Sequence, residues 1–179
     1  MPSTAVAPGE PMPAAARPQV AERELRSLVI GIGNPLRSDD GVGWRLAEEV
    51  GGLAVHQLTP ELAAELDRVD RVLFVDAWQV PQADADSGRA LPRLGPVPPG
   101  AGTPGSSHRL EPAQLLGLAA ALYGARPVAA ELLLPAWGFA HGTRFSPALR
   151  RQLPQARRLL RQWLFGKGLL RQGLRDADA

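Results

Sequence analysis

The fold of this chain is decided by residues 29–43, which read VIGIGNPLRSDDGVG. A short apolar run enters a glycine-rich turn, an acidic pair follows, and two more glycines flank the start of the next segment. Glycine allows the backbone to turn tightly or to pass close to another group. Because a helix N-terminus favours negative charge, we expect Asp39 and Asp40 to be ionised and able to hold a cation. The stretch predicts a metal-binding corner on an α/β sheet.

Outward from this stretch, short apolar runs alternate with helical patterns. Strands are expected at 28–33, 53–58, 71–75 and 127–134, with a possible strand at 90–94. Helices are expected at 41–50, from Thr59, at 111–123 and from Ser146, where Pro154 should kink or interrupt the last helix. Alternating strands and helices predict a three-layer α/β domain with a mainly parallel sheet.

Length and composition fit one globular domain, since 45% of the 179 residues are hydrophobic and 21% are charged. The absence of cysteine excludes disulfides, thiolate zinc sites and cysteine nucleophiles. We expect a disordered, proline-rich tail over residues 1–26, a folded domain over 27–165 and a C-terminal tail over 166–179. Neither a signal peptide nor a run of membrane-spanning length is visible, so we expect a cytoplasmic protein without a membrane partner.

Three side chains are expected at one edge of the sheet. In open α/β sheets ligands bind outside the carboxyl ends of the strands. Asp40 follows the first predicted strand, Asp76 ends the third, and His108 precedes a later helix. Two carboxylates and an imidazole suit a divalent metal of the nickel or zinc type, with coordination positions left open. Such a set would also balance the charge of the cation.

The motif over residues 31–43 resembles the signature of the [NiFe]-hydrogenase maturation endopeptidases. Similarity to this family extends from about Leu28 to Leu164 and includes the Phe145-Ser146-Pro147 entry to the last helix. In the family, the second acid of the pair, a later aspartate and a histidine bind the nickel of the substrate. The resemblance therefore implies that Asp40, Asp76 and His108 are the metal-binding and catalytic residues, with Asp40 standing where some members carry glutamate.

The resemblance also implies a fold and a reaction. The implied fold is a three-layer α/β/α sandwich on a five-stranded, mainly parallel mixed sheet of the phosphorylase/hydrolase-like kind. The implied activity is removal of the C-terminal extension of a hydrogenase large-subunit precursor after nickel insertion. Nickel would arrive with that precursor, which is the expected partner, and zinc or cadmium would serve as surrogates.

Each residue also has a simpler interpretation. Asp39 and Asp40 are suitable helix caps, and Asp39 alternatively supports a neighbouring ligand. Asp76 is a possible strand-end residue that accepts hydrogen bonds from loop amides, and His108 a possible loop histidine. Trp78 and Trp137 are expected to pack in the core or at the rim of the site, and contact with the substrate is the alternative. His141 is expected at a structural or surface position.

Two other classes of function stay open at this stage. One is a metal-binding or chaperone-like relative that kept the fold and lost the reaction. The other is a nucleotide-binding module, but the third glycine of a dinucleotide motif would fall at Leu36, and the acidic pair would repel phosphate. The arginines of the last helix lie opposite a leucine stripe, which indicates a solvated face and favours no nucleic-acid partner.

Overall fold

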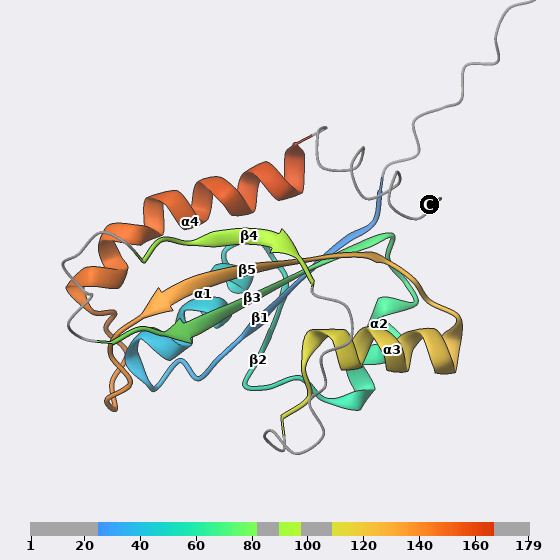
Figure 1. Cartoon of the computed structure of the whole chain (residues 1–179), viewed down its shortest axis with the longest axis horizontal. Coiled ribbons are helices and arrows are strands. Elements are labelled where there is room, and N and C mark those ends of the chain that lie inside the picture. The colour runs from blue at the N-terminus through green and yellow to red at the C-terminus, as the bar shows by residue number, and fades with distance from the viewer. Residues whose placement is uncertain (1–24, 82–89, 98–108, 167–179) are drawn as a thin grey trace, which may run out of the picture.

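The computed structural model describes residues 25–81, 90–97 and 109–166. Figure 1 shows the elements along this part of the chain. They are β1 (Ser27–Ile32), the 3₁₀-helix η1 (Ser38–Gly41), α1 (Val42–Glu48), β2 (Leu53–Val55), the 3₁₀-helix η2 (Pro60–Leu62), α2 (Ala63–Leu66), β3 (Arg71–Gln79), β4 (Arg93–Pro96), α3 (Pro112–Tyr123), β5 (Val128–Ala136) and α4 (Pro147–Phe165).

The strands form one sheet of five in the order β2-β1-β3-β5-β4. Neighbours among β2, β1, β3 and β5 run parallel, and only β4 is antiparallel to its neighbour β5. The sheet is therefore the five-stranded, mainly parallel mixed sheet expected above.

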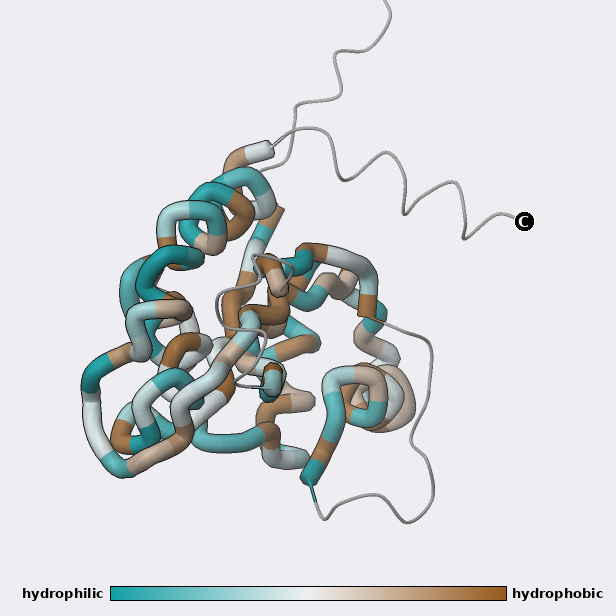
Figure 2. Tube along the Cα trace, turned by 60° about the vertical axis from the view of Figure 1, so that its left-hand side comes forward, coloured by the Kyte–Doolittle hydropathy of each residue, from teal (hydrophilic) through white to brown (hydrophobic). Residues whose placement is uncertain are grey.

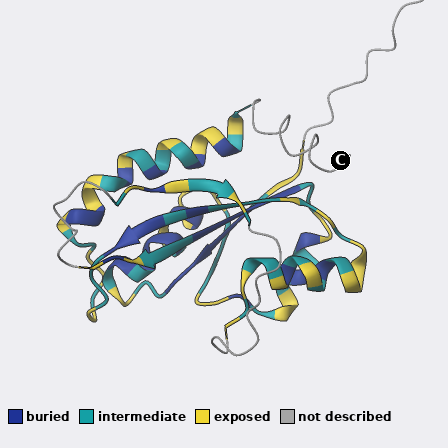
Figure 3. Cartoon of the chain, in the orientation of Figure 1, coloured by how far each residue is buried: buried dark blue, intermediate teal, exposed yellow. Residues whose placement is uncertain are grey.

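Helices cover both faces of the sheet, as Figure 1 shows. Side chains alternate between the faces along each strand. Val29 and Leu73 pack with the buried side chains of α1 and α4, whereas Ile30 and Phe74 pack with those of α2 and α3. In Figure 3 the central strands are the most deeply buried part of the molecule. The predicted three-layer α/β/α architecture is confirmed.

Several strand boundaries differ from the prediction. The prediction that Asp76 ends its strand is wrong, because β3 continues to Gln79 and Asp76 pairs with Leu133 in the parallel ladder. The ladder extends because β5 also runs further than expected, to Ala136. In contrast, β2 ends at Val55, and β4 begins three residues later than the predicted segment.

The last helix is continuous through its proline. Ser146 caps α4, since its Oγ accepts a hydrogen bond of 3.1 Å from the amide of Leu149. Of the two predicted effects of Pro154, a kink or an interruption, the interruption is wrong, because α4 runs unbroken from Pro147 to Phe165. Pro154 is exposed, so the carbonyl that loses its intrahelical partner lies on the solvent side, while the leucine stripe packs on the sheet. Figure 2 shows this amphipathic pattern as hydrophobic residues recurring between hydrophilic ones.

A buried arginine joins the end of α4 to the start of β3. The guanidinium of Arg71 donates to Ser27 Oγ at 2.7 Å and to the carbonyls of Trp163 and Leu164 at 2.9 and 2.7 Å. These carbonyls lack partners within the helix, and the helix C-terminus favours a cation. Burial lowers the pKa of Arg71. Arg71 thus fixes the C-terminal end of the longest helix on the sheet.

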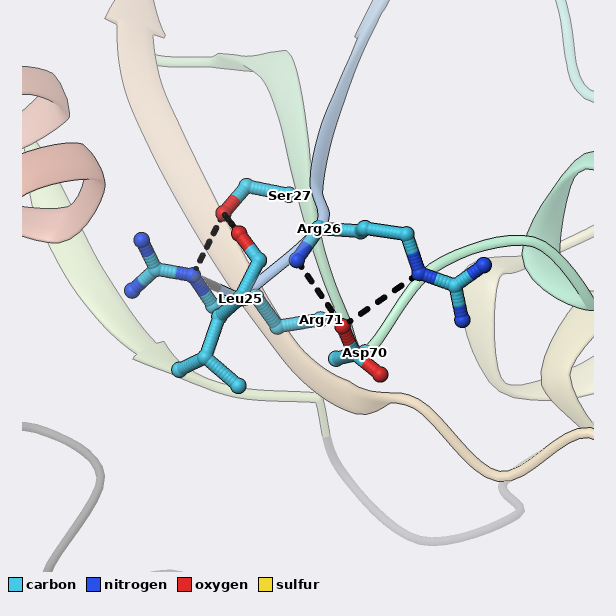
Figure 4. A network of polar contacts seen from close by, with 5 residues as sticks. All are labelled: Leu25, Arg26, Ser27, Asp70 and Arg71. Carbon is cyan, nitrogen blue, oxygen red and sulfur yellow. Dashed lines mark hydrogen bonds and ion pairs between the residues drawn. The ribbon is translucent and has the colours of Figure 1, made fainter. Parts of the chain in front are cut away.

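Two residues of the predicted N-terminal tail belong to the described part. Figure 4 shows the Arg26 amide donating to Asp70 at 2.8 Å, beside the Ser27–Arg71 contact. The rest of the segment 1–26 and residues 167–179 lie outside the described residues, so the two tails stay predictions. Among the helices that the structure describes, none is long and apolar enough to cross a membrane.

Candidate functional site

The candidate site lies where the order of the strands reverses. From β1 the chain first places β2 on one side and then β3 on the other. In open α/β sheets, such a switch point leaves a crevice outside the carboxyl ends of the two central strands. The chain passes from β1 through η1 into α1 at this crevice, and η1 contacts β3.

Glycines allow α1 to lie directly on the two central strands. A side chain at Gly43 would collide with the carbonyl oxygens of Ile32 and Val75, and one at Gly31 would collide with Gly43. Gly33 adopts a φ of 137°, which side-chain-bearing residues rarely adopt. The close approach of helix and sheet therefore explains this glycine spacing, and it holds the acidic pair at the edge of the sheet.

Asp39 is a completely buried anchor. Its Oδ2 accepts hydrogen bonds from the amides of Trp137 and Gly138, both at 3.0 Å, and from Ser146 Oγ at 2.7 Å. Its Oδ1 accepts from the Ser146 amide at 2.6 Å. Capping of its own helix is not observed, and Asp39 instead holds the loop after β5 and the first residue before α4. With four donors satisfied, this carboxylate has little capacity left for a metal.

Asp40 faces a different environment. It is only partly buried, and its Oδ2 accepts one hydrogen bond of 3.0 Å from the amide of Asn34. It makes no capping bond to the helix that follows, so the capping interpretation is wrong for Asp40 as well. Most of its carboxylate remains available for another ligand.

Asp76 lies within electrostatic reach of Asp40 and is the most perturbed acid at this edge. Burial raises the pKa of Asp76 to about 7. The amide of Ala77 opposes this effect with a hydrogen bond of 2.7 Å, and the negative charge of Asp40 adds to it. Two carboxylates in such surroundings favour a bound cation, which would compensate both charges.

A small pocket of about 70 Å³ opens beside Asp76. Its walls come from the end of β1, the segment after β2 and the entry to α3. Arg109 and Glu111 contribute the other charged side chains, and Gln57 contributes an amide. Arg109 lowers the pKa of Asp76 and Glu111 raises it, so both lie close enough to influence its charge.

Asp40 lies within electrostatic reach of Asp76. This agrees with their predicted placement at one edge of the sheet, and their role as metal ligands stays a prediction. His108 lies outside the described residues, directly before Arg109 at the pocket wall. Within the described residues, no group of three histidine, cysteine, aspartate or glutamate side chains could hold a metal. The three-residue set therefore stays a prediction.

Sequence reasoning missed the polar wall formed by Gln57, Arg109 and Glu111. Glu111 begins the capping box of α3, in which Gln114 accepts from its amide at 2.8 Å. From the sequence, Glu111 was recognisable only as the first residue of a predicted helix. Its position beside Asp76 depends on the packing of α3 against the sheet, where Leu115 and Ala119 contact the core around Ile30 and Phe74.

The remaining candidates are Trp137, Trp78 and His141, and their side chains have different surroundings. Trp137 packs against the α1–α4 core, as predicted, although its indole nitrogen is buried without a partner in the described structure. Trp78 lies under the guanidinium of Arg93, 4.0 Å from the ring centroid. His141 is exposed on the loop after β5.

No protein-family profile matches the sequence, and no curated protein matches it either. Solved structures do match. The [NiFe] hydrogenase maturation protease HycI from Thermococcus kodakarensis KOD1 superposes with a TM-score of 0.58 at 18% identity, covering 80% of this chain and 94% of that one. HybD from Thermococcus kodakarensis gives 0.56 at 18% identity, covering 78% and 99%. HybD from E. coli gives 0.52 at 18% identity, covering 80% and 94%. This chain therefore has the fold of the [NiFe]-hydrogenase maturation proteases.

Proposed function

We propose that this protein is an endopeptidase that removes the C-terminal extension of a [NiFe]-hydrogenase large-subunit precursor after nickel insertion. The observation that carries the proposal is the position of Asp40 within electrostatic reach of buried Asp76, at the switch point between β1 and β3. The fold supports it, because the structures that it matches over most of its length are hydrogenase maturation proteases.

Asp40, Asp76 and His108 are the residues that we expect to hold the nickel of the substrate. Two ionised carboxylates and a neutral imidazole would balance a divalent cation and leave positions open for the groups of the precursor. The site is unfavourable for two free negative charges, since burial and Asp40 both raise the pKa of Asp76. A cation would lower the pKa of Asp76 and hold both carboxylates in their ionised form.

Asp39 has a supporting role in this proposal. Because four hydrogen bonds fix its carboxylate, Asp39 holds in place the backbone of η1, which also carries Asp40. The metal enters as part of the substrate in this scheme, so the free protein needs no metal of its own. Location in the cytoplasm stays a prediction from the sequence.

The test is processing of the purified precursor, followed by the mass of the released large subunit. Asp40→Asn, Asp76→Asn and His108→Ala should each abolish or strongly reduce cleavage, because each removes one ligand with little change in shape at the aspartates. Asp67→Asn is the matched control, since Asp67 is an exposed aspartate after α2 and should retain full activity. Full activity in the Asp40 and Asp76 variants would contradict the metal site.

The nickel content of the precursor separates recognition of the metal from recognition of sequence alone. Nickel-loaded precursor should be cleaved and nickel-free precursor should not. Equal cleavage of both forms would remove nickel as the recognition element. Binding of the loaded precursor without cleavage by the wild-type protein would favour the non-processing relative, and micromolar binding of ATP or NAD would favour the nucleotide-binding module.

A further inference from the structure

Two loops beside the acidic pair join into one surface, which we call the platform (residues 34–38 and 137–145). The amide of Ser38 donates to the carbonyl of Gly142 at 2.7 Å, and the amide of Gly142 donates to the carbonyl of Leu36 at 2.8 Å. A parallel bridge links the two loops at the same point. Segments about one hundred positions apart in the sequence thus form one continuous surface.

Hydrogen bonds to a buried side chain and between the loops fix the position of the platform. The buried carboxylate of Asp39 binds the amides of Trp137 and Gly138, and Ser38 Oγ donates to the carbonyl of Arg144 at 2.6 Å. Loops are generally the more mobile parts of a fold, whereas these two are fixed by hydrogen bonds to a fully buried carboxylate. A surface fixed in this way is suited to bind a partner with little loss of conformational entropy.

The exposed side chains of the platform combine an apolar residue with basic ones. Leu36 is 51% exposed, and Arg37 and Arg144 are exposed on the two loops. Arg45 of α1 borders them, with its guanidinium 5.8 Å from the ring centroid of Phe145. Across the described part of the chain, no carboxylate forms an ion pair with any of these three arginines.

One arginine of α4 makes a useful contrast. Arg157 on that helix forms a two-pronged pair with Glu49, with hydrogen bonds of 2.6 and 2.8 Å. That charge is satisfied within the molecule. Within residues 25–81, 90–97 and 109–166, no acid pairs in this way with the platform arginines, so in this part of the chain their charges remain available to a partner.

We propose that the platform docks an acidic segment of the polypeptide substrate. This inference rests on the proposed function and adds the charge of the substrate region that binds outside the metal corner. Arginine pairs with carboxylates through two parallel hydrogen bonds, and the exposed side chain of Leu36 offers an apolar contact. The acidic corner of Asp40 and Asp76 would repel the same segment. An acidic segment of the substrate therefore binds the platform, while the cationic metal centre of the substrate binds at Asp40 and Asp76.

Charge reversal on the platform tests this inference. The double variant Arg37→Glu/Arg144→Glu changes two exposed side chains whose guanidinium groups make no hydrogen bond or ion pair in the described structure. We expect its KM for the nickel-loaded precursor to rise by about tenfold or more, with kcat nearly unchanged, because the lost interaction is with a remote part of the substrate. The matched control is Arg126→Glu/Arg158→Glu, which alters two exposed arginines away from the platform and should keep the wild-type KM.

Binding of the precursor is measured in parallel with processing, and polyglutamate is added as a competitor. Polyglutamate should inhibit the wild-type protein and the control, but not the platform variant. An unchanged KM and Kd in the platform variant, or equal inhibition of all three proteins, would overturn the inference and leave the proposed function intact. Tighter binding of duplex DNA than of precursor to the platform would also overturn it. A wild-type protein that neither binds nor cleaves the precursor would instead refute the proposed function, and this inference with it.

Discussion

Asp39 and Asp40 are neighbours of the same chemical type, and the fold gives them opposite surroundings. Asp39 is completely buried and accepts four hydrogen bonds, whereas Asp40 is partly buried and accepts one. One carboxylate holds the loops of the platform, and the other lies within electrostatic reach of Asp76. A carboxylate with all its acceptor positions filled stabilises structure, and one with free positions beside another acid is suited to bind a cation.

The largest expected effect is the loss of the Asp39 anchor. Asp39→Ala would leave the amides of Trp137 and Gly138 and both donors of Ser146 without a partner in a buried region. We expect the free energy of unfolding to fall by about 3 kcal/mol or more, since each unsatisfied buried group costs about 1–3 kcal/mol. Chemical denaturation would measure this. A loss below about 1 kcal/mol would show that water replaces the carboxylate.

The second largest effect is expected for Asp76→Asn, which should increase the free energy of unfolding, by an amount that depends on pH. Folding raises the pKa of Asp76 from 3.8 to about 7, so its ionisation weakens the folded state progressively between these values. Asp76→Asn keeps the acceptor for the Ala77 amide and removes this cost. In metal-free protein the variant should be more stable than the wild type above pH 7, by at most about 4 kcal/mol, and nearly equal at pH 4.

Thermal unfolding of both proteins across this pH range would measure the difference. Asp67→Asn is the control and should show no comparable pH dependence. A stability difference for Asp76→Asn that is the same at pH 4 and pH 8 would contradict the buried, charge-coupled position of Asp76.

The third largest effect on the free energy of unfolding is expected for Ser146, which hydrogen-bonds to Asp39. Ser146→Ala removes the cap of α4 and one of the four donors to Asp39, while the amide of residue 146 keeps its own bond. We expect a loss of about 1–2 kcal/mol in denaturation experiments. Because the same carboxylate is involved, the losses for Ser146→Ala and Asp39→Ala should not add in the double variant. Additive losses would separate the cap from the anchor.

The smallest expected effect on stability is that of Asp40. Asp40→Asn keeps the shape of the side chain and removes a charge that disfavours ionised Asp76. We expect the free energy of unfolding to change by less than about 1 kcal/mol in either direction. A loss as large as that for Asp39→Ala would show that Asp40 is also a structural anchor and would weaken the assignment of the metal corner.

The sequence by itself determined the layers of the fold and the glycine-bracketed acidic turn. Alternating apolar strands and amphipathic helices require a three-layer domain, because each face of the sheet must be covered. The Ser-Pro pair at residues 146–147 predicted the start of the last helix, and Ser146 caps it. Asp40 follows one predicted strand and Asp76 was expected at the end of another, so the sequence placed both at the same edge of the sheet. These features depend on local pattern and on the direction of parallel strands.

Only the tertiary structure decided what each polar side chain does. The family resemblance favoured Asp40 over Asp39 as a ligand, but the local residues do not show what Asp39 binds, since its partners lie about one hundred residues later, on the loop after β5. The length of β3 past Asp76 depended on its neighbour β5, and the continuity of α4 through Pro154 depended on packing against the sheet. Hydrogen-bond partners and packing surfaces from distant parts of the chain set these features, and a local sequence pattern does not contain them.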